Sequence, residues 1–76
     1  MKFANATLIK KNSDDGLFEV NENVQIGAQY VIDLDTLRVE EGYNIVFNKR
    51  WKREIVNVVD GGWFPTELLK IEEVFH

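Results

Sequence analysis

Apolar residues recur along the chain in short runs that alternate with polar positions and are separated by clusters of Gly, Asp and Asn. No run keeps the 3.6-residue apolar period over the ten or so residues that a helix needs. β-branched and aromatic residues fill the runs, which is typical of strands. The pattern therefore predicts an all-β domain.

The first two runs predict a β-hairpin. Residues 3–9 would form one strand, the polar stretch 10–16 the turn, and residues 17–20 the returning strand. Turn-forming Asn and Asp residues precede Gly16, which can adopt positive φ without steric cost. We therefore expect residues 1–27 to form an N-terminal hairpin extension.

The middle of the chain predicts three further strands. Residues 24–34 carry alternating apolar side chains and lead into an acidic stretch that we expect to be a loop. Residues 43–47 alternate again, a tight turn is expected at 48–49, and residues 51–59 form the next strand. This order predicts antiparallel neighbours joined by short connections.

The C-terminal part contains the strongest turn signal. Asp60 is followed by two adjacent glycines, which favours a tight hairpin turn. Pro65 lacks a backbone N–H and suits a strand end, so residues 66–68 are expected to form one 3₁₀ turn. Residues 69–75 then form the last strand.

Length and composition limit the organisation of the chain. Its 76 residues predict a single domain over 1–76, and 45% hydrophobic residues are enough for one folded core. The sequence has no cysteine, which leaves neither disulfides nor a thiolate metal site and favours a cytoplasmic protein. No stretch approaches the roughly 20 apolar residues of a membrane span, so no membrane partner is expected.

Charge is unevenly distributed. The formal net charge is −4, yet four of the nine cations lie within residues 49–53, which leaves five cations against 13 acidic residues. The sequence thus predicts one basic spot on an acidic domain, and the overall charge weighs against non-specific nucleic-acid binding.

A set of motifs appears in a recognisable order. Residues 62–69 read GWFPTELL, which resembles the SH3 signature of Gly, two mainly aromatic positions, Pro, Ser, Asn, Tyr and Val. Trp51 stands a strand and a turn upstream, where SH3 domains carry a binding-surface tryptophan. Residues 37–42 resemble the segment that closes the SH3 RT loop, and residues 28–30 the opening of the ALYDY segment. The resemblance covers about residues 28–74.

The resemblance implies a fold and a binding surface. The fold is an SH3-like, partly open barrel of about five short antiparallel strands, to which the N-terminal hairpin is added. In the family a shallow aromatic groove receives a polyproline II segment. By motif position, the implied groove residues are Tyr30, Trp51, Trp63, Pro65 and Leu68. Leu68 and Ile32 replace two family tyrosines, which removes two polar groups from the ligand site.

The resemblance also places acidic residues, Asp33 and Asp35 among them, in the RT loop. Family members use such residues to contact basic ligand side chains. The expected function is therefore a small non-enzymatic interaction module or regulator that binds a segment of another protein.

Two alternatives remain open from the sequence. A tryptophan flanked by cations could bind single-stranded nucleic acid, through Lys49, Arg50, Trp51, Lys52 and Arg53. Strand alternation, however, places only Lys49, Trp51 and Arg53 on one face. The second alternative is an obligate homo-oligomeric structural protein in which the N-terminal hairpin exchanges edges between copies.

Enzymatic chemistry has little support in the sequence. The only histidine is His76, and Ser13 has no neighbouring base. Adjacent acidic pairs diverge on an extended backbone and do not match metal-ligand spacing. We therefore expect no catalytic residues, no metal and no cofactor.

Overall fold

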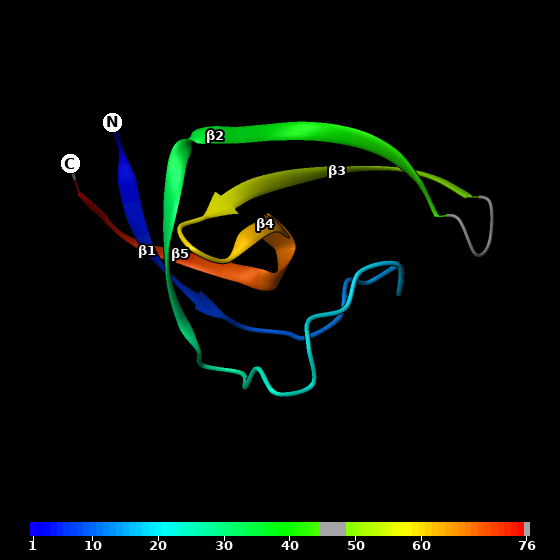
Figure 1. Cartoon of the computed structure of the whole chain (residues 1–76), viewed down its shortest axis with the longest axis horizontal. Helices are drawn as coiled ribbons and strands as arrows, with labels where there is room; N and C mark the ends of the chain where they lie inside the picture. The colour runs from blue at the N-terminus through cyan, green and yellow to red at the C-terminus, as the bar shows by residue number, and fades with distance from the viewer. Residues whose placement is uncertain (45–48, 76) are drawn as a thin grey trace.

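The computed structural model contains one antiparallel sheet and one 3₁₀ turn (Figure 1). The elements are β1 (Phe3–Leu8), β2 (Gln29–Asn44), β3 (Lys49–Val58), β4 (Gly62–Pro65), η1 (Thr66–Leu68) and β5 (Leu69–Phe75). The structure describes the backbone of residues 1–44 and 49–75 and the side chains of residues 1–42 and 52–75. The predicted all-β class is confirmed, and so is the 3₁₀ turn after Pro65.

The sheet has the strand order β4-β3-β2-β1-β5. β2 is long and bent, and its register with β3 shifts between Asp33 and Arg38. Its first part pairs with β1 on one side and with the end of β3 on the other, and its second part continues along β3 as a long two-stranded ribbon (Figure 1). The sheet curls without closing, as expected for a partly open barrel, and leaves β4 and β5 as its two edges.

The N-terminal strand differs from the expected hairpin. β1 pairs with β2, where Ala4 lies opposite Ile32, and with β5, where Leu8 lies opposite Leu69. Residues 17–20 form no strand, and they are joined to residues 11–13 by an isolated bridge between Asn12 and Glu19 and by the backbone hydrogen bonds Ser13 N–H to the Phe18 carbonyl and Val20 N–H to the Lys11 carbonyl. Every second residue of β1 is buried, so one face of the strand packs on the core, and its two neighbours are supplied by the distant strands β2 and β5. Residues 9–28 become a long loop.

The structure also corrects the prediction that the acidic stretch is a loop. Residues 37–42 lie within β2, and those from Arg38 onward pair with β3. Glu40 lies opposite Arg53, and Glu41 lies opposite Lys52. Opposite charges on facing strands are favourable, and Lys52 lies 3.9 Å from Glu41, whereas Glu40 pairs with Arg38 of its own strand. The predicted strand 43–47 and turn 48–49 fall largely on residues 45–48, outside the described residues.

The hairpin between β3 and β4 is confirmed. Gly61 N–H donates to the Val58 carbonyl over 2.9 Å, and both Asp60 and Gly62 have positive φ, of 63° and 83°. A Cβ on Gly61 would lie 2.8 Å from Val58 Cγ1. Gly62 is therefore needed because its φ is positive, and Gly61 is needed because a side chain would have no space.

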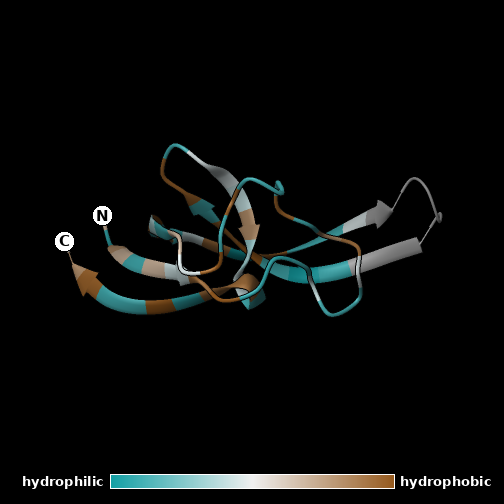
Figure 2. Ribbon diagram, turned by 90° about the horizontal axis from the view of Figure 1, so that it is seen from below, coloured by the Kyte–Doolittle hydropathy of each residue, from teal (hydrophilic) through white to brown (hydrophobic). Residues whose placement is uncertain are grey.

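The core lies on the inner side of the bent sheet. The largest fully buried side chains come from β1, β2, β3, β4 and η1 and are Leu8, Ile32, Leu68, Val56, Val58 and Pro65. Along the C-terminal strand, by contrast, apolar and polar positions interchange and nearly all are exposed (Figure 2). The core therefore joins segments from both ends of the chain, and the C-terminal strand contributes mainly through Leu69.

Truncation of a core residue tests this arrangement. Ile32→Ala should lower the free energy of unfolding by about 2–5 kcal/mol, because Ile32 is completely buried and a cavity would remain. Ile26→Ala is the matched control, since Ile26 is 61% exposed and its truncation should cost less than about 1 kcal/mol. Urea denaturation measures both values, and equal losses would contradict the described core.

Candidate functional site

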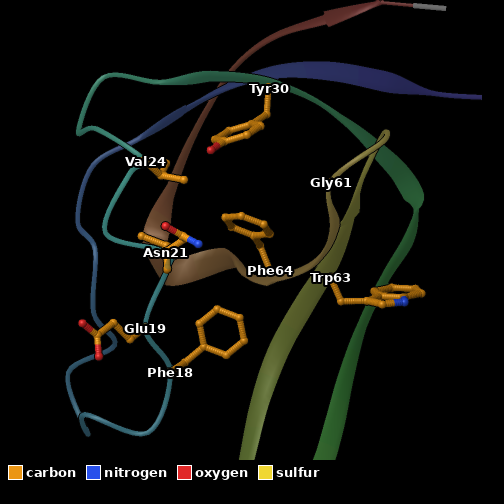
Figure 3. A pocket seen from close by; sticks show the side chains of 9 residues that line it. Phe18, Glu19, Asn21, Val24, Tyr30, Gly61, Trp63 and Phe64 are labelled. Carbon is orange, nitrogen blue, oxygen red and sulfur yellow. The ribbon is translucent and has the colours of Figure 1, made fainter.

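A groove of about 460 Å³ opens between the 9–28 loop and the strands β2 and β4 (Figure 3). It is lined by Phe18, Glu19, Val20, Asn21, Val24, Tyr30, Gly61, Trp63 and Phe64. Most of these residues are apolar, and four are aromatic. We call this feature the aromatic groove.

Phe64 forms the centre of the aromatic groove. Its ring centroid lies 5.4 Å from that of Tyr30 and 6.3 Å from that of Phe18, with tilted ring planes (Figure 3). Tilted ring pairs of this kind contribute about 0.5–1.5 kcal/mol each beyond the area they bury. All three rings are only half-buried. They therefore form a preformed wall that still offers apolar surface to a ligand.

Trp63 lines the groove from another direction and projects away from the three-ring stack (Figure 3). Trp63 is 41% exposed. The guanidinium of Arg38 lies over the indole at 4.4 Å, and Arg38 also pairs with Glu40 at 2.6 Å. The cation–π contact orients the indole while part of it stays accessible.

Ion pairs attach the 9–28 loop to the barrel. Arg53 on β3 lies 2.5 Å from Asp15 and 3.9 Å from Glu67, and its side chain is only 10% exposed. Lys10 bonds Asp14 at 2.7 Å and lies 3.6 Å from Glu67. The loop is thus bonded to both β3 and η1. We call the group of Arg53, Asp15 and Glu67 the loop clamp.

Hydrogen bonds inside the loop connect the loop clamp to the aromatic groove. The buried Ser13 hydroxyl donates to Asp15 Oδ1 over 2.5 Å and accepts from Phe18 N–H over 3.0 Å. Ser13 N–H in turn donates to the Phe18 carbonyl over 2.9 Å. Both the N–H and the carbonyl of Phe18 are thus bonded to Ser13, which is itself bonded to Asp15 of the loop clamp. These bonds hold one wall of the aromatic groove in place.

The same bonds perturb Asp15. The Ser13 hydroxyl and the Leu17 N–H donate to its carboxylate, and with Arg53 nearby they lower its pKa from 3.8 to about 2. Hydrogen bonds to the charged form are the largest cause. Asp15 is therefore ionised throughout the neutral range and keeps its bond to Arg53 there.

The residues predicted for the binding surface are only partly brought together. Tyr30 and Trp63 line the aromatic groove, whereas Pro65 and Leu68 are fully buried in the core. Trp51 lies opposite Gly42 in the β2–β3 pairing, and its side chain is outside the described residues.

Asp33 and Asp35 lie in β2 and not in a loop. Asp35 accepts a hydrogen bond from Lys2 N–H at 3.1 Å, and Asp33 accepts one from Asp35 N–H at 3.0 Å. Neither lines the aromatic groove. Their hydrogen bonds stay within the bend of β2 and the start of the chain.

The basic spot is largely matched by acidic neighbours where the structure describes it. Arg53 belongs to the loop clamp, and Lys52 lies 3.9 Å from Glu41. The side chains of Lys49 and Arg50 are outside the described residues. A converging cationic surface for phosphates is therefore absent from the described part of the spot.

Phe18, Val20, Val24 and Phe64 are groove residues that the sequence analysis did not single out. Phe18 and Val20 were assigned to the returning strand of the expected hairpin, and Phe64 entered only as one position of the SH3-like motif. The available signal was a pair of apolar residues, Phe18 and Val20, within an otherwise polar stretch. Such residues in a loop indicate that the loop packs against the barrel.

Neither a metal-ligand cluster nor a membrane-spanning helix is found in the described residues. In residues 1–44 and 49–75, no group of three or more His, Asp or Glu side chains could hold a metal ion. Within the same residues, no helix is long and apolar enough to cross a membrane.

Comparison with known proteins gives no assignment: no family model, no curated protein and no solved structure matches this chain.

The lowered pKa of Asp15 predicts that the free energy of unfolding falls in acid. Its folded-state pKa is below the unfolded value, so its stabilisation is complete above about pH 4 and is lost as the pH falls towards 2. Asp15→Asn should cost about 1 kcal/mol of unfolding free energy at pH 6, a value discounted because the carboxylate is 47% exposed. The cost should shrink towards zero at pH 2, as measured by urea denaturation across pH.

Asp14→Asn provides the neighbouring control. Asp14 is 85% exposed and pairs only with a surface lysine in the salt bridges described, so its loss should cost a few tenths of a kcal/mol. If Asp14→Asn and Asp15→Asn gave the same pH dependence, the loop clamp would not be the source of the effect.

Proposed function

We propose that this domain is an SH3-like, non-enzymatic interaction module or small regulator that binds an extended segment of another protein in the aromatic groove. The observation that carries the proposal is the half-exposed stack of Phe18, Phe64 and Tyr30, bordered by Trp63. Rings of this kind supply a large contact area at a low entropic cost on binding.

The SH3-like part of the proposal has support from both sequence and fold. The GWFP segment forms β4 and runs directly into the 3₁₀ turn and the last strand. The five antiparallel strands are compatible with a small, partly open barrel. In this fold the long 9–28 loop, and not residues 33–42, flanks the groove. The ligand-contacting loop is therefore reassigned to 9–28.

The shape and chemistry of the groove favour an extended apolar segment. Its volume falls in the range of ligand pockets, and its lining is mainly apolar with Glu19 and Asn21 as polar exceptions. Flat rings suit the ridges of a polyproline II segment, which loses little entropy on binding. The bonded loop means that the groove does not need to form on binding, which lowers the free-energy cost of association.

Selection from a phage-displayed library of short random peptides tests this proposal. The wild-type protein should enrich peptides with clustered proline or aliphatic residues. Trp63→Ala and Phe18→Ala each remove one wall of the groove and should weaken a selected peptide about tenfold or more, measured by calorimetry. Circular dichroism confirms that the variants fold.

Phe75→Ala is the matched control, because Phe75 is an aromatic residue of similar exposure outside the groove. It should leave peptide affinity unchanged. The proposal is contradicted if no peptide is enriched, or if Trp63→Ala and Phe18→Ala bind the selected peptides as tightly as Phe75→Ala does.

A further inference from the structure

The two edges of the sheet are built differently. β4 has four residues and ends in Pro65, and both features make an edge unsuited to further pairing. β5 has seven residues, contains no proline and, among the described elements, pairs only with β1. Three large apolar side chains on this strand are exposed: Ile71 by 38%, Val74 by 48% and Phe75 by 38%. β5 is therefore the edge that can accept another strand.

The hydrogen-bond direction along β5 identifies the groups that face outward. Ile9 N–H donates to the Leu68 carbonyl over 2.9 Å, and Thr7 lies opposite Lys70 in the same register. In an antiparallel ladder, bonded and non-bonded residue pairs alternate. The backbone groups of residues 68 and 70 thus point to β1, and those of Ile71 point away from it. Ile71 presents its N–H and carbonyl at the free edge.

The charges on β5 complement one another in one self-pairing register. If a second copy pairs antiparallel with Ile71 opposite its own counterpart, Lys70 lies opposite Glu72 of the second copy, and symmetry repeats the pair. Lys70 is at a non-bonded position of the new ladder, where facing side chains are closest, and Glu72 lies at the start of the bulge in β5. A register centred on Glu72 would instead oppose two identical carboxylates.

We propose that the chain forms a symmetric dimer in which β5 pairs with β5 of a second copy, centred on Ile71. The two sheets then become continuous, and the exposed Ile71 side chains pack against each other. The register shift opposite Ala4–Ala6 places a bulge between Ile71 and Val74, which ends the new ladder early. The interface between the two copies is consequently small, and the dimer is reversible. It is independent of the aromatic groove, which shares no residue with β5.

Sedimentation equilibrium over a range of protein concentrations tests this dimer. The wild-type chain should associate into dimers as its concentration rises. Lys70→Glu and Glu72→Lys should each weaken the dimer about tenfold, because each replaces two attractive pairs by two repulsive ones. The double variant Lys70→Glu/Glu72→Lys restores opposite charges and should recover dimerisation to within about threefold of the wild type.

Lys52→Glu is the control for net charge, since Lys52 is 69% exposed on the β2–β3 ribbon away from β5. It should dimerise like the wild type. A chain that stays monomeric up to about 1 mM would overturn the proposal. Single variants that dimerise as the wild type does, or a double variant that does not recover, would equally overturn the Ile71-centred register.

Discussion

The contact between Arg53 and Asp15 is the interaction on which the candidate site depends. Residues 9–28 form a long connection with little regular structure, and such a loop alone would present no fixed surface. The loop clamp bonds it to β3 and η1, and Ser13 extends this bonding to Phe18. One wall of the aromatic groove is thus positioned by electrostatics and hydrogen bonds, while the opposite wall, Phe64 and Trp63, is positioned by the β3–β4 hairpin.

Local signals in the sequence predicted the local structure well. The turn at Asp60–Gly62, the strand before it and the 3₁₀ turn after Pro65 each depend on neighbouring residues, and all are present. Strand partners depend on contacts between distant segments, which a pattern of alternating residues does not specify. The alternation in Phe3–Leu8 indicated a half-buried strand but not that β2 and β5 flank it. The acidic stretch of β2 was mistaken for a loop because its pairing with β3 joins distant parts of the chain and is not visible in neighbouring residues.

The candidate site was likewise predicted only in part from the sequence. Tyr30 and Trp63 were predicted from the SH3 resemblance and line the groove, whereas Pro65 and Leu68, predicted by the same motif, are buried. Phe18 and Phe64 were missed, since their exposure follows from how the loop folds back and not from their sequence neighbours. Motif position therefore located the strand that carries the site, and packing determined which side chains on it face a ligand.

In the proposed function, the aromatic groove, and not another surface, receives the protein segment. Intermolecular nuclear Overhauser effects between the labelled domain and a selected unlabelled peptide test this most directly. The account predicts contacts from the peptide to the ring protons of Phe18, Phe64 and Tyr30, which line one connected groove. Contacts confined to β5 or to the β2–β3 ribbon, with none to these three rings, would contradict it.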